Sequence, residues 1–157
     1  MVEAISLPAA WQVRFQAGDN EGCADTVKDG TGGSAGLRPH ELLEASLATC
    51  MTISARMALS DLGIADGEVR VRVHLERERS GTRFRYELIL DPALEPHRPA
   101  VTESVERSPV RSTLSKQLTF EPVGARSDHR SRTTSPDGWE QQIRTSPGAG
   151  SSTGSGA

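Results

Sequence analysis

Cysteine is the residue of this chain best suited to nucleophilic or redox chemistry, and the chain has two, Cys23 and Cys50. Cys50 lies in the middle of an apolar segment with helical spacing, which makes it a buried or half-buried thiol. A reactive cysteine needs a neighbouring cation or hydrogen-bond donors that stabilise its thiolate. The dipole of the predicted helix fades within its first turn, well before Cys50. Activation must therefore come from residues outside this helix turn.

A metal or another cofactor is not expected. The histidines have no spacing that would assemble a metal site with either cysteine; they are His40, His74, His97 and His129. The segment 29–36 is glycine-rich but lacks the Gly-Lys-Ser/Thr ending and the spacing of a phosphate-binding loop. We predict neither a helix nor a strand there.

The main helix that carries Cys50 is predicted to begin at Pro39 and to end after Leu62, where Gly63 stops it. Glu41 and Glu44 lie near its positive end. Apolar residues cover almost every side of this helix. We therefore expect it to be surrounded by protein.

A β-hairpin is expected after the helix, with its turn at Ser80-Gly81. In that register the apolar pairs are Val71 with Leu90, Val73 with Leu88, Leu75 with Tyr86 and Arg77 with Phe84. The charged pairs on the other face are Arg70 with Asp91, His74 with Glu87, Glu76 with Arg85, and Glu78 with Arg83. The dry face covers the Cys50 helix, so the fold class is α+β, with an antiparallel sheet packed on a long central helix.

The remaining elements are shorter. We expect strands at 11–15 and, more weakly, at 23–28, and a final strand at 117–123. Helical turns are expected at 101–107 and 109–116. Ser108, next to Pro109, is predicted to cap the second of these turns through its hydroxyl.

Composition limits the partners and the domain organisation. The chain has 157 residues and a net charge of −3, and it lacks the basic excess of a nucleic-acid-binding surface. No segment approaches the roughly 20 apolar residues of a membrane span, and no signal peptide is expected. We therefore expect a cytoplasmic protein with free thiols. Residues 1–124 form the predicted domain. Residues 125–157 are predicted to be a disordered low-complexity tail, in which only Trp139 and Ile143 could anchor the tail to the domain.

Two motifs carry a resemblance to a known family. Residues 36–50 read Gly-Leu-Arg-Pro-His-Glu-Leu-Leu-Glu-Ala-Ser-Leu-Ala-Thr-Cys, and residues 108–114 read Ser-Pro-Val-Arg-Ser-Thr-Leu. In this order and separation they resemble the osmotically inducible protein C and organic hydroperoxide resistance family (OsmC/Ohr). The resemblance extends from about residue 11 to residue 123. It implies an OsmC-like fold, an intertwined homodimer, and a thiol peroxidase site at the subunit interface.

The resemblance also implies roles for individual residues. Cys50 would attack the distal oxygen of an organic hydroperoxide, and Glu41 would orient the cation that stabilises the thiolate. The family's glutamate usually stands ten residues before the cysteine, where this chain has His40, one step before Glu41. The candidates for the cation are Arg14, Lys28, Arg38 and Arg56.

The second motif departs from the family at Ser108, where a cysteine is usual. A serine cannot form a disulfide with an oxidised Cys50. Three alternatives remain: an external thiol reduces Cys50, Cys23 does so, or the protein is not a peroxidase. In the last case we expect a non-catalytic OsmC-like dimer that binds a small apolar molecule in its interface cleft.

Overall fold

The structure is a computed structural model that describes residues 1–123, of which Met1–Thr119 form one compact unit. The predicted tail at 125–157, with Trp139 and Ile143, lies outside the described residues. The strands are β1 (Glu3–Ser6), β2 (Val13–Ala17), β3 (Asn20–Ala24), β4 (Val27–Lys28), β5 (Thr31–Gly32), β6 (Val69–Glu78) and β7 (Gly81–Leu90). The helices are α1 (Pro39–Asp61), a 3-10 helix η1 (Pro92–His97), α2 (Arg98–Glu106) and α3 (Pro109–Leu114).

The predicted main helix is confirmed as α1. Pro39 is its first residue, Leu62 is its C-cap, and Gly63 follows with a φ of +76°. This left-handed backbone favours glycine, which ends the helix where the sequence indicates. At the other end the Glu41 carboxylate accepts the backbone N–H of Arg38 at 2.8 Å and so supports the first turn.

The predicted hairpin is confirmed as β6 and β7, but its register is wrong by two residues. Val71 faces Leu88 rather than Leu90, and Leu75 faces Phe84 rather than Tyr86. The loop is Arg79-Ser80, because Gly81 already pairs with Glu78. Of the expected charged contacts, Glu76 with Arg85 is present as an ion pair at 3.3 Å. Two ion pairs form that the predicted register did not include: Arg72 with Glu87 at 3.2 Å and Glu76 with Arg83 at 3.6 Å.

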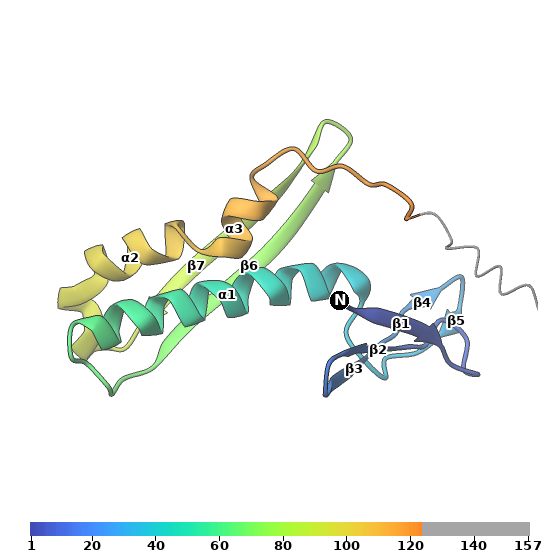
Figure 1. The fold of residues 1–157 in the computed structure, drawn as a ribbon, viewed down its shortest axis with the longest axis horizontal. Coiled ribbons are helices and arrows are strands. Elements are labelled where there is room, and N and C mark those ends of the chain that lie inside the picture. The colour runs from blue at the N-terminus through green and yellow to red at the C-terminus, as the bar shows by residue number, and fades with distance from the viewer. Residues whose placement is uncertain (124–157) are drawn as a thin grey trace, which may run out of the picture. The chain divides into compact units, whose positions relative to one another are not determined.

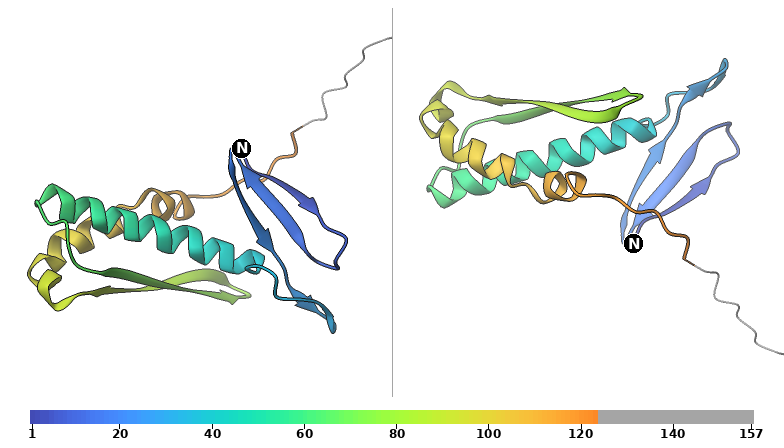
Figure 2. Two further views of the ribbon diagram at one scale, coloured as in Figure 1. Left: turned by 90° about the horizontal axis from the view of Figure 1, so that it is seen from below. Right: turned by 90° about the horizontal axis from the view of Figure 1, so that it is seen from above.

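The hydrophobic core lies between α1 and the dry face of this hairpin, with α2 and α3 alongside (Figures 1 and 2). Its buried members are Leu47, Met51, Ala55, Leu59, Leu90, Leu94, Val101 and Val105. The α1 residues in this set recur every four positions along one stripe of the helix. The arrangement confirms the α+β class with an antiparallel sheet on a long helix.

The N-terminal segment forms a three-stranded antiparallel sheet, β1-β2-β3, and a small β4–β5 ladder. The strand expected from Trp11 begins at Val13, because Trp11 lies in a turn with a φ of 62°. The strand expected at 23–28 is split between β3 and β4, and the glycine-rich segment contributes the two-residue strand β5. Most side chains of β1 to β3 are exposed. This sheet therefore has little core of its own.

Asp25 organises the loop between β3 and α1. Its buried carboxylate accepts the backbone N–H groups of Thr26 (2.7 Å), Gly33 (3.3 Å) and Ala35 (3.1 Å). The Ala35 hydrogen bond, followed by those of Thr26 and Gly33, lowers the pKa of the Asp25 carboxyl. One ionised side chain thus closes the whole β4–β5 loop.

Two short-element predictions have different outcomes. The helical turns expected at 101–107 and 109–116 are confirmed as α2 and α3. The final strand expected at 117–123 is wrong, because these residues have no regular structure. The side chains of Phe120 and Val123 are almost fully exposed.

One expectation about membranes also needs correction. Over an 18-residue window α1 has a mean hydropathy of 1.2, so by length and composition it is apolar enough to cross a bilayer. The expectation that no segment approaches a membrane span was therefore wrong. The core helix of a globular protein passes the same test. Here α1 contributes four residues to the core but is only 22% buried over that window, so within one chain it is not surrounded by protein.

Candidate functional site

Cys50 lies half-buried in α1, on the side of the helix that α3 contacts. Its Sγ accepts the backbone N–H of Val110 over 3.5 Å. Val110 is the second residue of α3, where a backbone N–H has no partner within its own helix. The sulfur therefore fills a hydrogen-bonding position that α3 leaves open.

Ser108 lies immediately before α3, as its N-cap residue. The predicted hydroxyl cap is absent: the side chain makes no capping hydrogen bond. Ser108 is fully buried, and its Oγ is without a hydrogen-bond partner among the described residues. By contrast, the Ser104 hydroxyl donates to the Ser54 carbonyl at 2.9 Å. The second motif, residues 108–114, thus contacts Cys50 through the backbone N–H of Val110 rather than through the side chain of Ser108.

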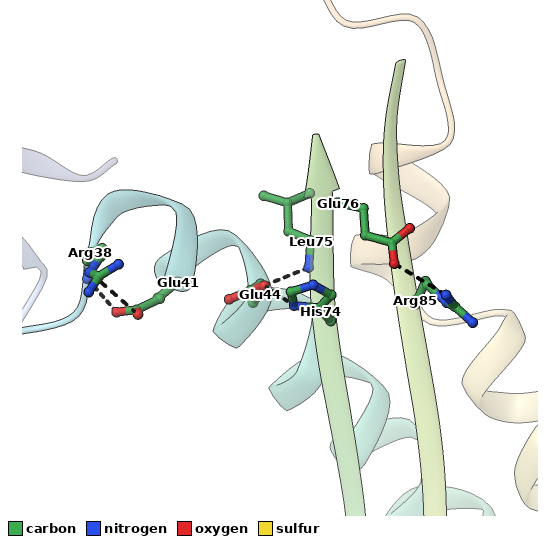
Figure 3. A network of polar contacts seen from close by, with 7 residues as sticks. All are labelled: Arg38, Glu41, Glu44, His74, Leu75, Glu76 and Arg85. Carbon is green, nitrogen blue, oxygen red and sulfur yellow. Dashed lines mark hydrogen bonds and ion pairs between the residues drawn. The ribbon is translucent and has the colours of Figure 1, made fainter. Parts of the chain in front are cut away.

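Glu41 lies at the N-terminal end of α1, beside Arg38 (Figure 3). Besides the backbone hydrogen bond, its carboxylate lies 3.9 Å from Arg38 Nε, and both side chains are largely exposed. The separation of nine positions between Glu41 and Cys50 corresponds to a rise of about 13 Å along the helix. The structure therefore pairs Glu41 with an arginine, but within one chain it does not bring that pair to the sulfur.

The other candidate cations have different contacts. Arg56 donates to the carbonyls of Ala65 and Gly67, the latter at 3.0 Å, and so closes the turn before β6. Arg14 and Lys28 belong to the N-terminal strands and are exposed. None of these contacts involves Cys50.

His40, at the position where the family's glutamate is usual, is exposed, and its Nε2 lies 3.2 Å from Arg77 Nη1. One turn further along α1, the Glu44 carboxylate accepts the backbone N–H of Leu75 at 2.6 Å and lies 3.7 Å from His74 Nδ1 (Figure 3). These contacts fix the start of α1 against the end of β6. Sequence reasoning missed them, because a helix carboxylate that accepts a strand N–H leaves no spacing signal.

A cleft of about 370 Å³ opens between α1, β7 and α3, lined by neighbours of Cys50 in α1 but not by Cys50 itself. Its lining residues come from α1, β7 and the α3 segment: Leu47, Met51, Thr82, Arg83, Phe84, Tyr86, Arg111, Leu114 and Ser115. Leu47 and Met51 flank Cys50 in α1, and Arg111 follows Val110 in α3. The cleft is apolar along α1 and carries guanidinium groups on its other walls.

Both cysteines are free thiols in this chain. Among residues 1–123, no group of three or more histidine, cysteine or acidic side chains could hold a metal ion. The chemistry that the described residues can support is therefore that of a half-buried thiol with a backbone N–H donor, next to a cleft.

The sequence profile of the OsmC-like protein family matches residues 30–123. That range contains α1 with Cys50 and the complete second motif. The chain belongs to the OsmC-like family. This confirms the resemblance derived from the two motifs. The comparison with curated proteins found no match.

Solved OsmC-like structures have the same fold. An OsmC-like protein of Mycoplasma pneumoniae is 16% identical, with a TM-score of 0.57, and the match covers 73% of this chain and 85% of that one. A Psychrobacter arcticus protein, described as an osmotic stress induced and detoxification response protein, is 17% identical, with a TM-score of 0.59 and coverage of 71% and 85%. A Legionella pneumophila organic hydroperoxide resistance protein OsmC is 16% identical, with a TM-score of 0.52 and coverage of 73% and 88%. At these identities the comparison establishes the OsmC-like fold.

Proposed function

We propose that this OsmC-like protein reduces organic hydroperoxides through Cys50, as part of oxidative stress defence. The observation that carries the proposal is the hydrogen bond from Val110 N–H to Cys50 Sγ. A hydrogen bond to a thiolate stabilises the charged form, which is the nucleophile. The family membership and the hydroperoxide resistance named for the Legionella pneumophila relative point to the same chemistry.

The proposed cycle has three balanced steps. The Cys50 thiolate attacks the distal peroxide oxygen, the O–O bond breaks, and the departing alkoxide takes a proton to become an alcohol. Sulfur has then lost two electrons as sulfenic acid. A small external thiol condenses with it to a mixed disulfide and water, and a second thiol molecule releases Cys50 and an external disulfide. An external reductant is required because Ser108 occupies the position of the second cysteine.

The cleft supports an organic rather than a purely polar substrate. The apolar residues of its lining include Leu47 and Met51 of α1, together with Phe84 and Leu114. Such a surface suits the hydrocarbon part of a hydroperoxide. We place the organic tail there, with the peroxide group directed to the sulfur.

We also propose that the active species is a homodimer. A stripe of exposed apolar side chains runs along α1, including Leu43, Ile53 (60% exposed) and Met57 (62% exposed). The N-terminal sheet has little core of its own, as described above. A second copy would cover both surfaces. In such a dimer the Arg38–Glu41 pair of one subunit could lie near Cys50 of the other subunit, although the two are far apart within one chain.

The cytoplasm is the compartment that we propose for this reaction. Both thiols of the described chain are free. A reducing compartment maintains that state and supplies the external thiol.

The test is intact-mass spectrometry of the reduced protein after one equivalent of cumene hydroperoxide, with a sulfenic-acid trap present. We expect one trapped adduct on Cys50, formed faster than on free cysteine, and none in Cys50→Ser. Cys23→Ser is the matched control and should trap as the unmodified protein does. A Cys50 rate no greater than that of free cysteine would refute the peroxidase.

The second candidate is a non-catalytic OsmC-like dimer that binds a small apolar molecule. The observation that favours it is the same cleft, together with the placement of Glu41 at a helix cap. The two candidates predict different results for Cys50→Ser. The peroxidase consumes hydroperoxide and loses that activity in the variant, whereas the binding protein consumes none in either form and binds an apolar fluorescent probe equally well in both.

A further inference from the structure

The unpartnered hydroxyl of Ser108 is the polar group in the core that the proposed cycle does not yet use. It is fully buried, and its Oγ is the side-chain atom found buried without a partner in residues 1–123. An unsatisfied buried hydroxyl is costly, and natural proteins keep few of them. Its retention beside the Cys50 contact calls for a functional explanation.

One donor that Ser108 would ordinarily use as an N-cap is taken by the sulfur of Cys50. An N-cap serine ordinarily accepts the N–H of the second or third helical residue. In α3 the N–H of the second residue, Val110, donates to Cys50 Sγ instead. The sulfur therefore accepts an N–H that a capping hydroxyl of Ser108 would ordinarily accept, which places the sulfur and Ser108 at the same end of α3.

We infer that Ser108 is a positioning residue whose hydroxyl donates a hydrogen bond to the oxygen that Cys50 gains on oxidation. This inference rests on the proposed function, since the oxygen arrives with the peroxide step. No new bond is made by Ser108: the S–O bond is already formed, and the hydroxyl only donates its proton to a hydrogen bond. The Val110 N–H and the Ser108 hydroxyl then stabilise the sulfenate together until an external thiol arrives.

The inference gives Ser108 a role that differs from that of a resolving thiol. A cysteine at 108 would consume the sulfenic acid, whereas a hydroxyl at 108 preserves it. The chain would thus favour a persistent sulfenic acid, reduced from outside. A sulfenic acid that persists can still be oxidised to sulfinic acid by a second peroxide molecule, so the external thiol must reach it first.

The experiment compares sulfenic-acid lifetimes in the full-length chain carrying Cys23→Ser, so that Cys50 is the one thiol. Sulfenic acid is generated with tert-butyl hydroperoxide, the peroxide is removed, and the trap is added after increasing delays. Loss of one neutral hydrogen bond predicts that Ser108→Ala shortens the lifetime by about five- to tenfold.

Two further variants separate this role from a purely structural one. Ser104→Ala removes a hydroxyl four residues earlier, in α2, that donates to the Ser54 carbonyl. It should lower the thermal midpoint and leave the sulfenic-acid lifetime unchanged. Ser108→Thr keeps the hydroxyl and should restore the lifetime that Ser108→Ala loses. A thermal melt of each variant confirms that it is folded.

The possible failures are distinguishable. Equal lifetimes in Ser108→Ala and the parent would overturn the role of Ser108, while rapid oxidation of Cys50 would leave the proposed function intact. If tert-butyl hydroperoxide oxidises Cys50 no faster than free cysteine, the peroxidase proposal fails. Excess hydrogen peroxide then generates the sulfenic acid instead, and the lifetime comparison still decides the role of Ser108.

Discussion

The sulfur of Cys50 and the backbone N–H of Val110 are 60 residues apart in the sequence and 3.5 Å apart in the fold. The contact joins the two motifs from which the family resemblance was derived. It also shows why Pro109 suits its position: a proline has no N–H to contribute, and it starts α3 so that the next N–H is free. Cys50 is thus a sulfur with a fixed donor.

Replacing Glu41 separates a capping role from a catalytic one. Glu41→Gln keeps a side chain that can complete the capping box, so stability should change by less than about 0.5 kcal/mol. If Glu41 orients a cation at the active site, hydroperoxide consumption should fall about tenfold or more, as expected for one charged hydrogen bond. Urea unfolding and a peroxidase assay measure the two effects. Unchanged consumption would leave Glu41 as a cap alone.

Ile53 tests the proposed dimer. Ile53→Lys places a charge in the exposed apolar stripe of α1, where a second copy would have to bury it. We expect sedimentation velocity to show a monomer for this variant and a dimer for the unmodified chain. Glu106→Lys, at an exposed position of α2, makes a charge change away from that stripe and should remain dimeric. If the unmodified chain sediments as a monomer, the proposed dimer is refuted.

Leu59 and Leu62 form a matched pair for the core. Leu59 is fully buried and Leu62 is 50% exposed, three residues further along the chain. Leu59→Ala should lower the free energy of unfolding by about 2 to 5 kcal/mol, because it leaves a cavity. Leu62→Ala should lower it by less than about 0.5 kcal/mol. Equal losses in urea unfolding would contradict the placement of the core.

Asp25 predicts a pH dependence with a definite sign. Its folded-state pKa is depressed by the backbone donors of the loop, chiefly Ala35, so the ionised carboxylate stabilises the fold. That stabilisation is complete above the unfolded pKa of about 3.9 and is lost as the pH falls through the folded value. Asp25→Asn should therefore be less stable than the unmodified chain near neutral pH, and the two should converge in acid. Parallel thermal midpoints across this range would show that the carboxylate does not hold the loop.

The sequence predicted the elements around Cys50 well, because each had a local signal. Pro39 and Gly63 bound α1, and Pro109 starts α3. The hairpin faces were also predictable. Its register was not, since a slip of two residues returns every side chain to the same face and leaves the hydrophobic pattern unchanged.

The rest of the candidate site depends on contacts that no spacing encodes. The donor to Cys50 is a backbone group, and backbone groups carry no sequence signal. Ser108 was expected to cap α3, but a sulfur from a distant helix took its hydrogen-bond donor. The segment 117–123, expected to be a strand from its residue types, has no regular structure, because strand pairing depends on a partner that residue types do not specify.

The hydrogen bond from Leu75 to Glu44 has a further consequence for solubility. An exposed strand edge is a template on which other chains can add strands and aggregate. The Glu44 carboxylate accepts the Leu75 N–H, which points away from β7. Two residues further along β6, the Arg77 side chain contacts His40. An incoming strand would have to displace a charged hydrogen bond there. The first turns of α1 thus protect the end of β6 against unwanted self-association.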